Sequence, residues 1–265
     1  MDYSEIEKQI ARRRQVLNEL APIDAGVWLG EPEGFPLACE MKPEDLDAFG
    51  GRYSLHGCLV SHWWGKTAGA AQGNAALGRP MGDDRYVVWT ALPRYPSEPG
   101  LLPGPDLRPD YVKGVRIFPR AHNFLMSRWQ IGGLCEWLER SRVPLFVWHT
   151  ELEWDALYTL VGEFPRLRVI VETQPLKILY ATRKLFALMK ERSNVLVELS
   201  NFAGAGFIEY AVREFGAQRL IYGSFAPMND PLVPLGMIID ASITVEEKRL
   251  LAGDNLRQLL REVGS

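Results

Sequence analysis

The stretch PLFVWHT, residues 144–150, joins an apolar run directly to a histidine. The run has no alternation of polar and apolar residues, so it predicts a strand that is buried on both faces, as in a parallel sheet. Seven further runs of similar length and composition occur along the chain. Together the predicted strands cover residues 23–28, 55–61, 86–91, 112–118, 144–149, 167–172, 194–199 and 219–223.

Segments of helical periodicity lie between these strands. Helices are predicted at residues 127–140, 151–162, 176–191 and 206–215. The second and third connections are less regular, since residues 66–79 are rich in Gly and Ala and residues 93–109 are rich in Pro. Eight strand-plus-connection units, spaced by roughly 28 residues, favour one closed (β/α)8 TIM barrel. An open doubly wound sheet is the alternative.

Two further helical segments lie outside this repeat. Residues 2–20 predict an amphipathic helix laid against the domain, and residues 244–263 predict a C-terminal helical extension. The apolar residues of the first helix are Ile6, Ile10, Leu17 and Leu20. No linker divides the chain, so we expect a helix at 1–21 followed by a single barrel domain at 22–265.

Composition limits the classes of partner. The 265 residues include 30 Lys and Arg against 33 Asp and Glu, and this net charge of −3 argues against nucleic acid as the main partner. The three cysteines form no CxxC pair and the charged N-terminus lacks a signal-peptide run, so we expect a cytoplasmic protein without a membrane partner. A homodimer, with the N-terminal helix as one candidate interface, stays open.

The reacting groups of TIM barrels come from the carboxyl ends of the strands and the loops that follow. Several polar and aromatic residues are expected at those ends. They are Trp28, His62, Arg116, His122, His149, Glu172, Glu198, Ser200 and Ser224.

Six motifs support a more specific interpretation. They are IDAGVW (23–28), KGVRIFP (113–119), VWHT (147–150), VLVELS (195–200), IYGSFAP (221–227) and AGDNL (252–256). In order and spacing they resemble the amidohydrolase-related (amidohydrolase 2) metal-dependent hydrolases. The resemblance implies a TIM barrel with a His-x-His pair on its first strand, a histidine from the fifth and an aspartate from the eighth. These residues hold a divalent ion that activates water.

This sequence departs from that pattern at the ligand positions. Gly26 and Trp28 stand where the resemblance implies the His-x-His pair, and Phe225 stands at the aspartate position. A sixth-strand histidine is also missing at Glu172-Thr173, so only His149 remains. Because one imidazole cannot hold zinc and carbon rings offer no lone pair, we expect no metal and no cofactor, with zinc or manganese as the alternative.

The remaining candidates carry competing interpretations. His149 is a candidate general base or a hydrogen-bonded structural histidine. Glu172 and Glu198 are candidate catalytic carboxylates, and Arg116 is either the partner of a structural ion pair or a group that orients an anionic substrate. Strand alternation places Glu198 and Ser200 on the same side. The substrate-binding candidates are Trp28, His62, Arg116, His122, Ser200 and Ser224.

Three functions are consistent with these residues. The first is a metal-independent hydrolase or lyase that binds a small organic acid or a sugar-derived lactone at the C-terminal barrel face. The second is a small-molecule-binding pseudoenzyme that has lost its chemistry. The third is a metal-dependent hydrolase whose site is rebuilt from His62, His122 and His149 with Glu172 or Glu198.

Overall fold

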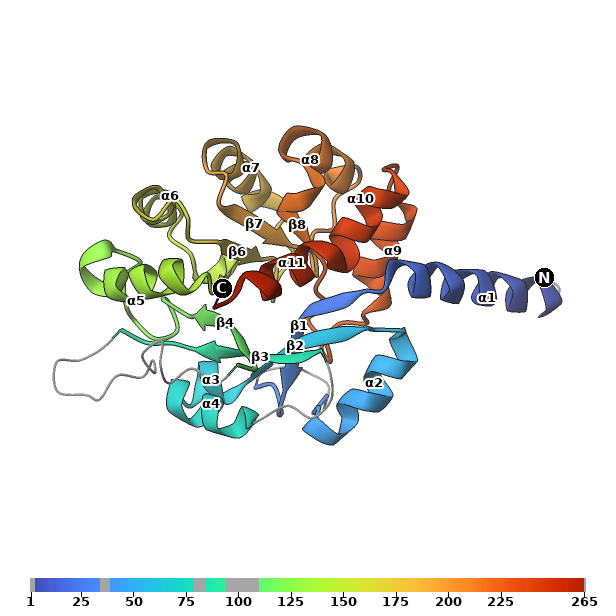
Figure 1. Ribbon diagram of the computed structural model, residues 1–265, viewed down its shortest axis with the longest axis horizontal. Helices are drawn as coiled ribbons and strands as arrows, with labels where there is room; N and C mark the ends of the chain where they lie inside the picture. The colour runs from blue at the N-terminus through green and yellow to red at the C-terminus, as the bar shows by residue number, and fades with distance from the viewer. Residues whose placement is uncertain (1–2, 34–38, 79–83, 94–109, 265) are drawn as a thin grey trace.

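The computed structural model describes residues 3–33, 39–78, 84–93 and 110–264. Within these ranges eight strands follow one another around the sheet in chain order, and each is parallel to the next (Figure 1). The strands are β1 (Ile23–Leu29), β2 (Gly57–His62), β3 (Arg85–Thr90), β4 (Val112–Ile117), β5 (Leu145–Trp148), β6 (Val169–Glu172), β7 (Val195–Glu198) and β8 (Leu220–Ile221). The predicted (β/α)8 TIM barrel is confirmed.

The last strand meets the first through hydrogen bonds that close the ring. The backbone N–H of Ala25 donates to the Tyr222 carbonyl at 3.1 Å, and that of Trp28 donates to the Ala226 carbonyl at 2.8 Å. A closed ring leaves no unpaired sheet edge at which another chain could pair.

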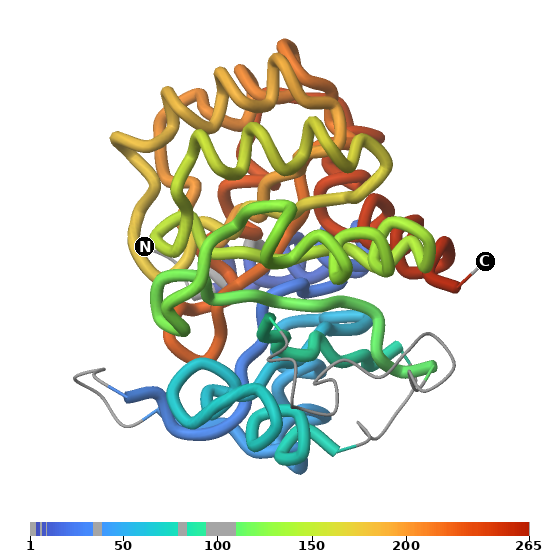
Figure 2. The backbone as a smooth tube through the Cα atoms, turned by 90° about the vertical axis from the view of Figure 1, so that its left-hand side faces the viewer, coloured from blue at the N-terminus to red at the C-terminus, as the bar shows by residue number. Residues whose placement is uncertain are grey.

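Helices surround the strands on the outside (Figures 1 and 2). They are α1 (Tyr3–Leu20), α2 (Leu46–Tyr53), α3 (Trp64–Thr67), α4 (Ala70–Leu77), α5 (Arg128–Ser141), α6 (Trp154–Glu163), α7 (Thr182–Glu191), α8 (Phe207–Phe215), α9 (Leu232–Asp240), α10 (Val245–Arg249) and α11 (Asn255–Glu262). In the described part of the chain, none of them is long and apolar enough to cross a membrane.

The N-terminal end of the barrel is covered by α11, which crosses the centre of the strands in Figure 1. Its apolar side chains join a buried cluster from the inside of the barrel. The members of this inner cluster are Ile23, Ala25, Leu59, Val88, Phe146, Ile170, Leu196, Ile221, Leu256, Leu259 and Leu260. Burial of leucine side chains is worth about 1.5–3 kcal/mol each, so α11 is an integral part of the barrel.

The N-terminal helix α1 forms as predicted but does not lie along the domain. Figure 1 shows it projecting away from the strands. Leu17 and Leu20 are buried, at 6% and 3% exposure, whereas Ile10 is 50% exposed. The expectation of a helix laid against the domain is therefore wrong for all but its last turns.

Other differences from the sequence prediction have local causes. The helix α2 was not predicted because it carries Gly50-Gly51, and α9 was not predicted because it contains Pro234 and is apolar almost throughout. The segment predicted as a helix at 176–191 begins its α-helix only at Thr182, after a 3-10 turn at Leu179–Ala181. The C-terminal extension is interrupted by a π-helical turn at Leu250–Asp254. Residues 94–109 of the Pro-rich connection lie outside the described residues.

Candidate functional site

Five aromatic rings fill the barrel at the carboxyl ends of its strands. This ring cluster consists of Trp28, Trp63, Phe118, Trp148 and Phe225. Trp28 contacts each of the other four, with ring centroids 5.0–6.4 Å apart. None of the five is more than 4% exposed. Such tilted and edge-to-face contacts are favourable, so the cluster acts as a packed layer.

Arg116 stacks on this cluster and pairs with Glu172. The guanidinium carbon lies 4.5 Å from the Trp28 ring centroid. Arg116 Nε donates to Glu172 Oε2 at 2.8 Å, Nη2 donates to Oε1 at 2.5 Å, and Nη1 donates to the Ser61 hydroxyl. Burial raises the pKa of Glu172, and the positive charge of Arg116 opposes that rise. The ion pair, one of the two interpretations of Arg116, is present, and the guanidinium is buried at 1% exposure.

Gln174 links this ion pair to the ring cluster. Its amide donates to Glu172 Oε1 at 3.0 Å and its carbonyl accepts from Trp28 Nε1 at 2.8 Å. Gln174 was not among the residues predicted from the sequence. Side chains two residues apart in an extended chain lie on the same side. The sequence could therefore have indicated that Gln174 lies on the same side as Glu172.

Glu198 is completely buried and bound by donors from its own loop and the neighbouring one. Its carboxylate accepts from the Ser200 N–H at 2.6 Å, the Ser200 hydroxyl at 2.9 Å and the Thr173 N–H at 3.1 Å. Burial raises the pKa of Glu198 to about 8, and the charge of Glu172 adds to this rise. The Cβ of any larger residue at Gly223 would collide with Glu198 Oε1, so the carboxyl group is enclosed on this side. Glu198 and Ser200 share a side, as strand alternation predicts.

Asp24 and Ser224 together join β1 to β8. Asp24 Oδ1 accepts from the backbone N–H groups of Gly26 and Ser224, both at 2.9 Å, and the Ser224 hydroxyl accepts from the Ala226 N–H at 2.9 Å. Asp24 and Ser224 are 0% exposed, and burial raises the pKa of Asp24. The Ser224 hydroxyl thus lies at the seam between β1 and β8, and its role in substrate binding stays a prediction.

The three candidate histidines lie in different environments. His149 is 9% exposed and donates from Nδ1 to the Glu172 carbonyl at 3.3 Å. His62 accepts from the Trp64 N–H at 3.2 Å, and His122 donates from Nε2 to the Lys66 carbonyl at 3.0 Å. Burial lowers the pKa of all three. Burial thus favours the neutral imidazole in each case, and each ring has a backbone partner.

A cavity of about 570 Å³ opens at the rim of the same barrel face, between the loops after β4 and β5. We call it the rim cavity. Its lining residues are Pro119, Arg120, Asn123, Phe124, Leu125, Met126, Ser127, Gln130, Glu151, Glu153 and Ala156. Its volume and mixture of apolar and polar walls are typical of small-molecule sites.

Charged groups of the rim cavity are paired. Glu151 is 7% exposed, accepts from the Ala121 N–H at 2.8 Å and lies 3.8 Å from Lys66 Nζ. Arg120 pairs with Glu153 at 3.2 Å, and both side chains are mostly exposed. The buried Ser127 hydroxyl has no hydrogen-bond partner among the described residues. None of these residues was a candidate from sequence, because two separate loops bring them together.

The residues at the ligand positions of the family pattern do not fit a divalent cation. The Trp28 N–H is already bound to Gln174, and the ring of Phe225 has no donor atom. A side chain at Gly26 would meet Gln174 Nε2 at 3.2 Å and the Phe225 backbone N at 3.3 Å. In the described ranges, His, Cys, Asp and Glu side chains form no group of three or more that could hold a metal ion. The set of His62, His122 and His149 with Glu172 or Glu198 is thus not assembled there.

No protein-family model matches this sequence, and no curated protein matches it. Solved structures do share its fold. An amidohydrolase 2 from Bifidobacterium longum subsp. infantis aligns with a TM-score of 0.66 and 15% identity, over 91% of this chain and 98% of that chain. The 2,6-dihydroxybenzoate decarboxylase from Rhizobium aligns with a TM-score of 0.66 and 12% identity, over 91% and 98%.

A third similar structure is the 5-carboxyvanillate decarboxylase from Novosphingobium aromaticivorans, complexed with manganese and 4-hydroxy-3-methoxy-5-nitrobenzoic acid. It aligns with a TM-score of 0.68 and 11% identity, over 92% of this chain and 97% of that chain. These structures share the TIM-barrel fold of this chain, so the fold implied by the resemblance is confirmed.

Proposed function

We propose that this barrel binds a small organic acid at its C-terminal face, without the metal ion of the family pattern. The acid is bound but is not converted into a product. The ring cluster is the observation that carries the proposal. Aromatic rings occupy the end of the barrel where the metal-ligating side chains and the reactive water of the family pattern would have to lie. A pseudoenzyme on a hydrolase fold is consistent with the general rule that function follows the site rather than the fold.

The state of the candidate catalytic groups supports this proposal. Glu172 and Glu198 are 0% exposed and hydrogen-bonded, and Arg116 is 1% exposed. A general acid or base must reach the proton that it transfers, directly or through one water. Carboxyl groups enclosed in this way serve the barrel as a structural polar layer.

The rim cavity provides the binding site of the proposal. Phe124, Leu125 and Met126 offer an apolar surface and Arg120 offers a cation. Arg120 is exposed, so its guanidinium can exchange Glu153 for a ligand carboxylate at little expense in free energy. Two of the fold neighbours are decarboxylases of aromatic acids, which makes a benzoic acid a sensible first probe.

The test uses 2,6-dihydroxybenzoate as the probe and follows both binding and consumption. We expect saturable binding by calorimetry with no loss of the acid over a long incubation. Arg120→Ala should weaken binding about tenfold, the effect of one lost charge-assisted contact. Arg213→Ala is the matched control, because Arg213 is equally exposed and lies on α8, outside the cavity.

Two results would overturn the proposal. Consumption of the acid at an enzymatic rate, abolished by His149→Ala, would support the metal-independent enzyme instead. Absence of binding, or equal loss in the Arg120 and Arg213 variants, would remove the rim cavity as the site.

A further inference from the structure

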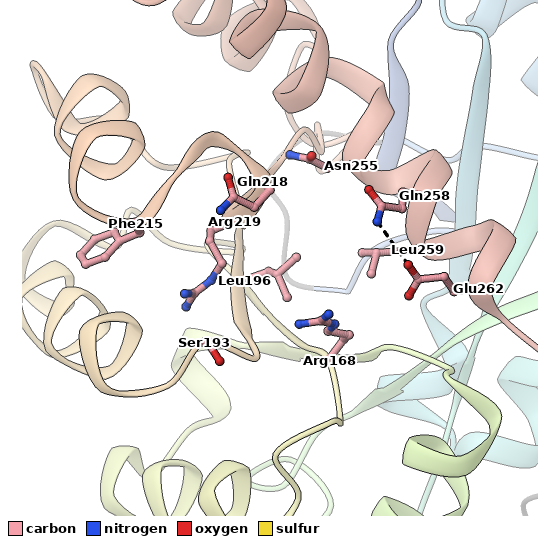
Figure 3. A pocket seen from close by; sticks show the side chains of 10 residues that line it. All are labelled: Arg168, Ser193, Leu196, Phe215, Gln218, Arg219, Asn255, Gln258, Leu259 and Glu262. Atoms are coloured by element: carbon pink, nitrogen blue, oxygen red, sulfur yellow. Dashed lines mark hydrogen bonds between the residues drawn. The ribbon is translucent and has the colours of Figure 1, made fainter.

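A second cavity, of about 390 Å³, lies at the opposite, N-terminal end of the barrel. Residues at the starts of β6, β7 and β8 form one wall and α11 forms the other (Figure 3). The lining residues are Arg168, Ser193, Leu196, Phe215, Gln218, Arg219, Asn255, Gln258, Leu259 and Glu262. No part of the ring cluster or of the rim cavity contributes to it.

Arg219 is the fixed element of this cavity. Its side chain is only 9% exposed. Nε donates to the Val195 carbonyl at 2.6 Å, and Nη2 donates to the carbonyls of Arg192 at 2.7 Å and Met189 at 3.3 Å. Met189 and Arg192 are at the end of α7, where carbonyl groups favour a cation. The third nitrogen, Nη1, makes no hydrogen bond to the described residues.

A second guanidinium adds like charge beside the first. Arg168 lines the same cavity, and Figure 3 shows its guanidinium and that of Arg219 beside Leu196. Among the described residues neither arginine forms an ion pair with a carboxylate. The pKa of Arg219 is lowered to about 10, first by burial and then by the charge of Arg168. The cavity therefore contains two guanidinium groups, and in the described part of the chain no carboxylate pairs with either of them.

The facing wall is polar without being strongly acidic. Gln258 and Glu262 extend from α11, and Gln258 Nε2 donates to Glu262 Oε1 at 3.3 Å (Figure 3). Leu196 and Leu259 supply an apolar surface between the walls. Two guanidinium groups face one carboxylate, so the balance of charge in the cavity favours an anion.

We propose that this cavity binds a small anion with a carboxylate or phosphate group, held between Arg168 and Arg219. Arg219 presents Nη1 on a side chain that backbone carbonyls have already oriented, which lowers the entropy lost on binding. Arg168 is exposed and moves onto the ligand as a second donor. This site is separate from the rim cavity, and its occupation does not depend on the function proposed there.

The test titrates inorganic phosphate and, in a second arm, malonate into the full chain by calorimetry. We expect millimolar or tighter binding of at least one of them, and the arm that binds identifies the group recognised. Arg168→Ala should weaken binding about tenfold. Arg166→Ala removes the same charge two residues away, where Arg166 pairs with Glu139 outside the cavity, and should leave binding unchanged.

The Glu262→Gln variant should change the affinity for the anion in the opposite direction. Removal of this carboxylate should tighten anion binding by several-fold, since like charge is taken out of the cavity. Both key variants alter exposed or half-exposed side chains, so the fold should survive, and a thermal melt confirms it. Failure of both anions to bind, or equal losses in the Arg168 and Arg166 variants, would overturn the site.

Discussion

Arg116 and Glu172 lie on β4 and β6, with β5 between them, yet they form a two-point ion pair at 2.8 Å and 2.5 Å. Both side chains are excluded from solvent, at 1% and 0% exposure. The pair spans the inside of the barrel, and Gln174 connects it to Trp28. The ion pair, the Gln174 amide and the Trp28 indole thus form one network in which the groups are hydrogen-bonded to one another.

Breaking this ion pair from one side should destabilise the fold strongly. Glu172→Gln leaves the Arg116 guanidinium buried without its counter-charge, and we expect a loss of about 3–5 kcal/mol in the free energy of unfolding. Replacement of both residues, Glu172→Gln with Arg116→Met, should cost less than the sum of the single changes. Urea denaturation of the four proteins measures the coupling. Additive effects would show that the two side chains do not interact as described.

Trp28 should be the most sensitive member of the ring cluster, because it contacts the other four rings. Trp28→Ala removes these contacts and the hydrogen bond to Gln174, so a loss of about 3–5 kcal/mol is expected. Trp28→Phe should lose less. Trp129→Ala is the control, since Trp129 is 77% exposed and its removal should change the free energy of unfolding by less than about 0.5 kcal/mol.

Metal content is expected to stay well below one ion per chain. Cells grown with added zinc and manganese should yield protein with substoichiometric metal by elemental analysis, because Trp28 and Phe225 provide no ligand atom. Neither metal should raise the melting temperature. A stoichiometric ion that is lost together with His149→Ala would show that a metal site exists after all.

Glu198 should make stability depend on pH. Its pKa rises from 4.5 to about 8 on folding, so between these values the folded state holds a proton that the unfolded state has released. The free energy of unfolding should therefore fall as pH rises through this window, by at most about 1.4 kcal/mol per pH unit. Denaturation at a series of pH values measures the slope.

Glu198→Gln should flatten that slope, because an amide does not titrate. The variant should also be less stable at every pH, since one amide N–H must face the N–H of Thr173 or Ser200. An unchanged slope would assign the pH dependence to another group. Asp24 is the next candidate, as burial raises its pKa too.

Removal of residues 1–14 should leave the stability of the barrel almost unchanged, because among the described side chains of α1 the buried ones, Leu17 and Leu20, are in its last turns. Leu17→Ala is the contrasting change and should lower the free energy of unfolding by about 2–5 kcal/mol. Light scattering of the same shortened chain tests the homodimer left open above. Dissociation of a dimer on truncation would make α1 its interface.

The sequence was sufficient for most of the barrel. Buried parallel strands need continuous apolar runs, and such runs at 144–149 and 194–199 place β5 and β7 within one residue or so of their observed ends. The side on which Glu198 and Ser200 lie followed from the strand period. The need of a buried carboxylate for a counter-charge indicated Arg116 as a partner, but the sequence did not decide between Glu172 and Glu198.

The rest of the site depended on contacts that periodicity does not encode. Gln174 reaches Trp28 from the far side of the barrel, and the Lys66–Glu151 pair joins two loops whose paths no local pattern determines. The helix α2 was not predicted, because it contains Gly50-Gly51 and glycine is unfavourable inside a helix. Trp148 was part of a motif, but its contact with Trp28 depends on how β1 and β5 are arranged around the barrel, which the sequence pattern does not give.

The closing bonds between β1 and β8 and the cover supplied by α11 have a consequence for biosynthesis. A ribosome releases Ile23 long before it releases Leu220, and Leu259 later still. The first strand therefore keeps an unsatisfied edge, and the hydrophobic interior stays open to water, until nearly the whole polypeptide has been made. Nascent chains of this protein are expected to be substrates for molecular chaperones, and a stop codon before α11 should yield an aggregating product rather than a shortened barrel.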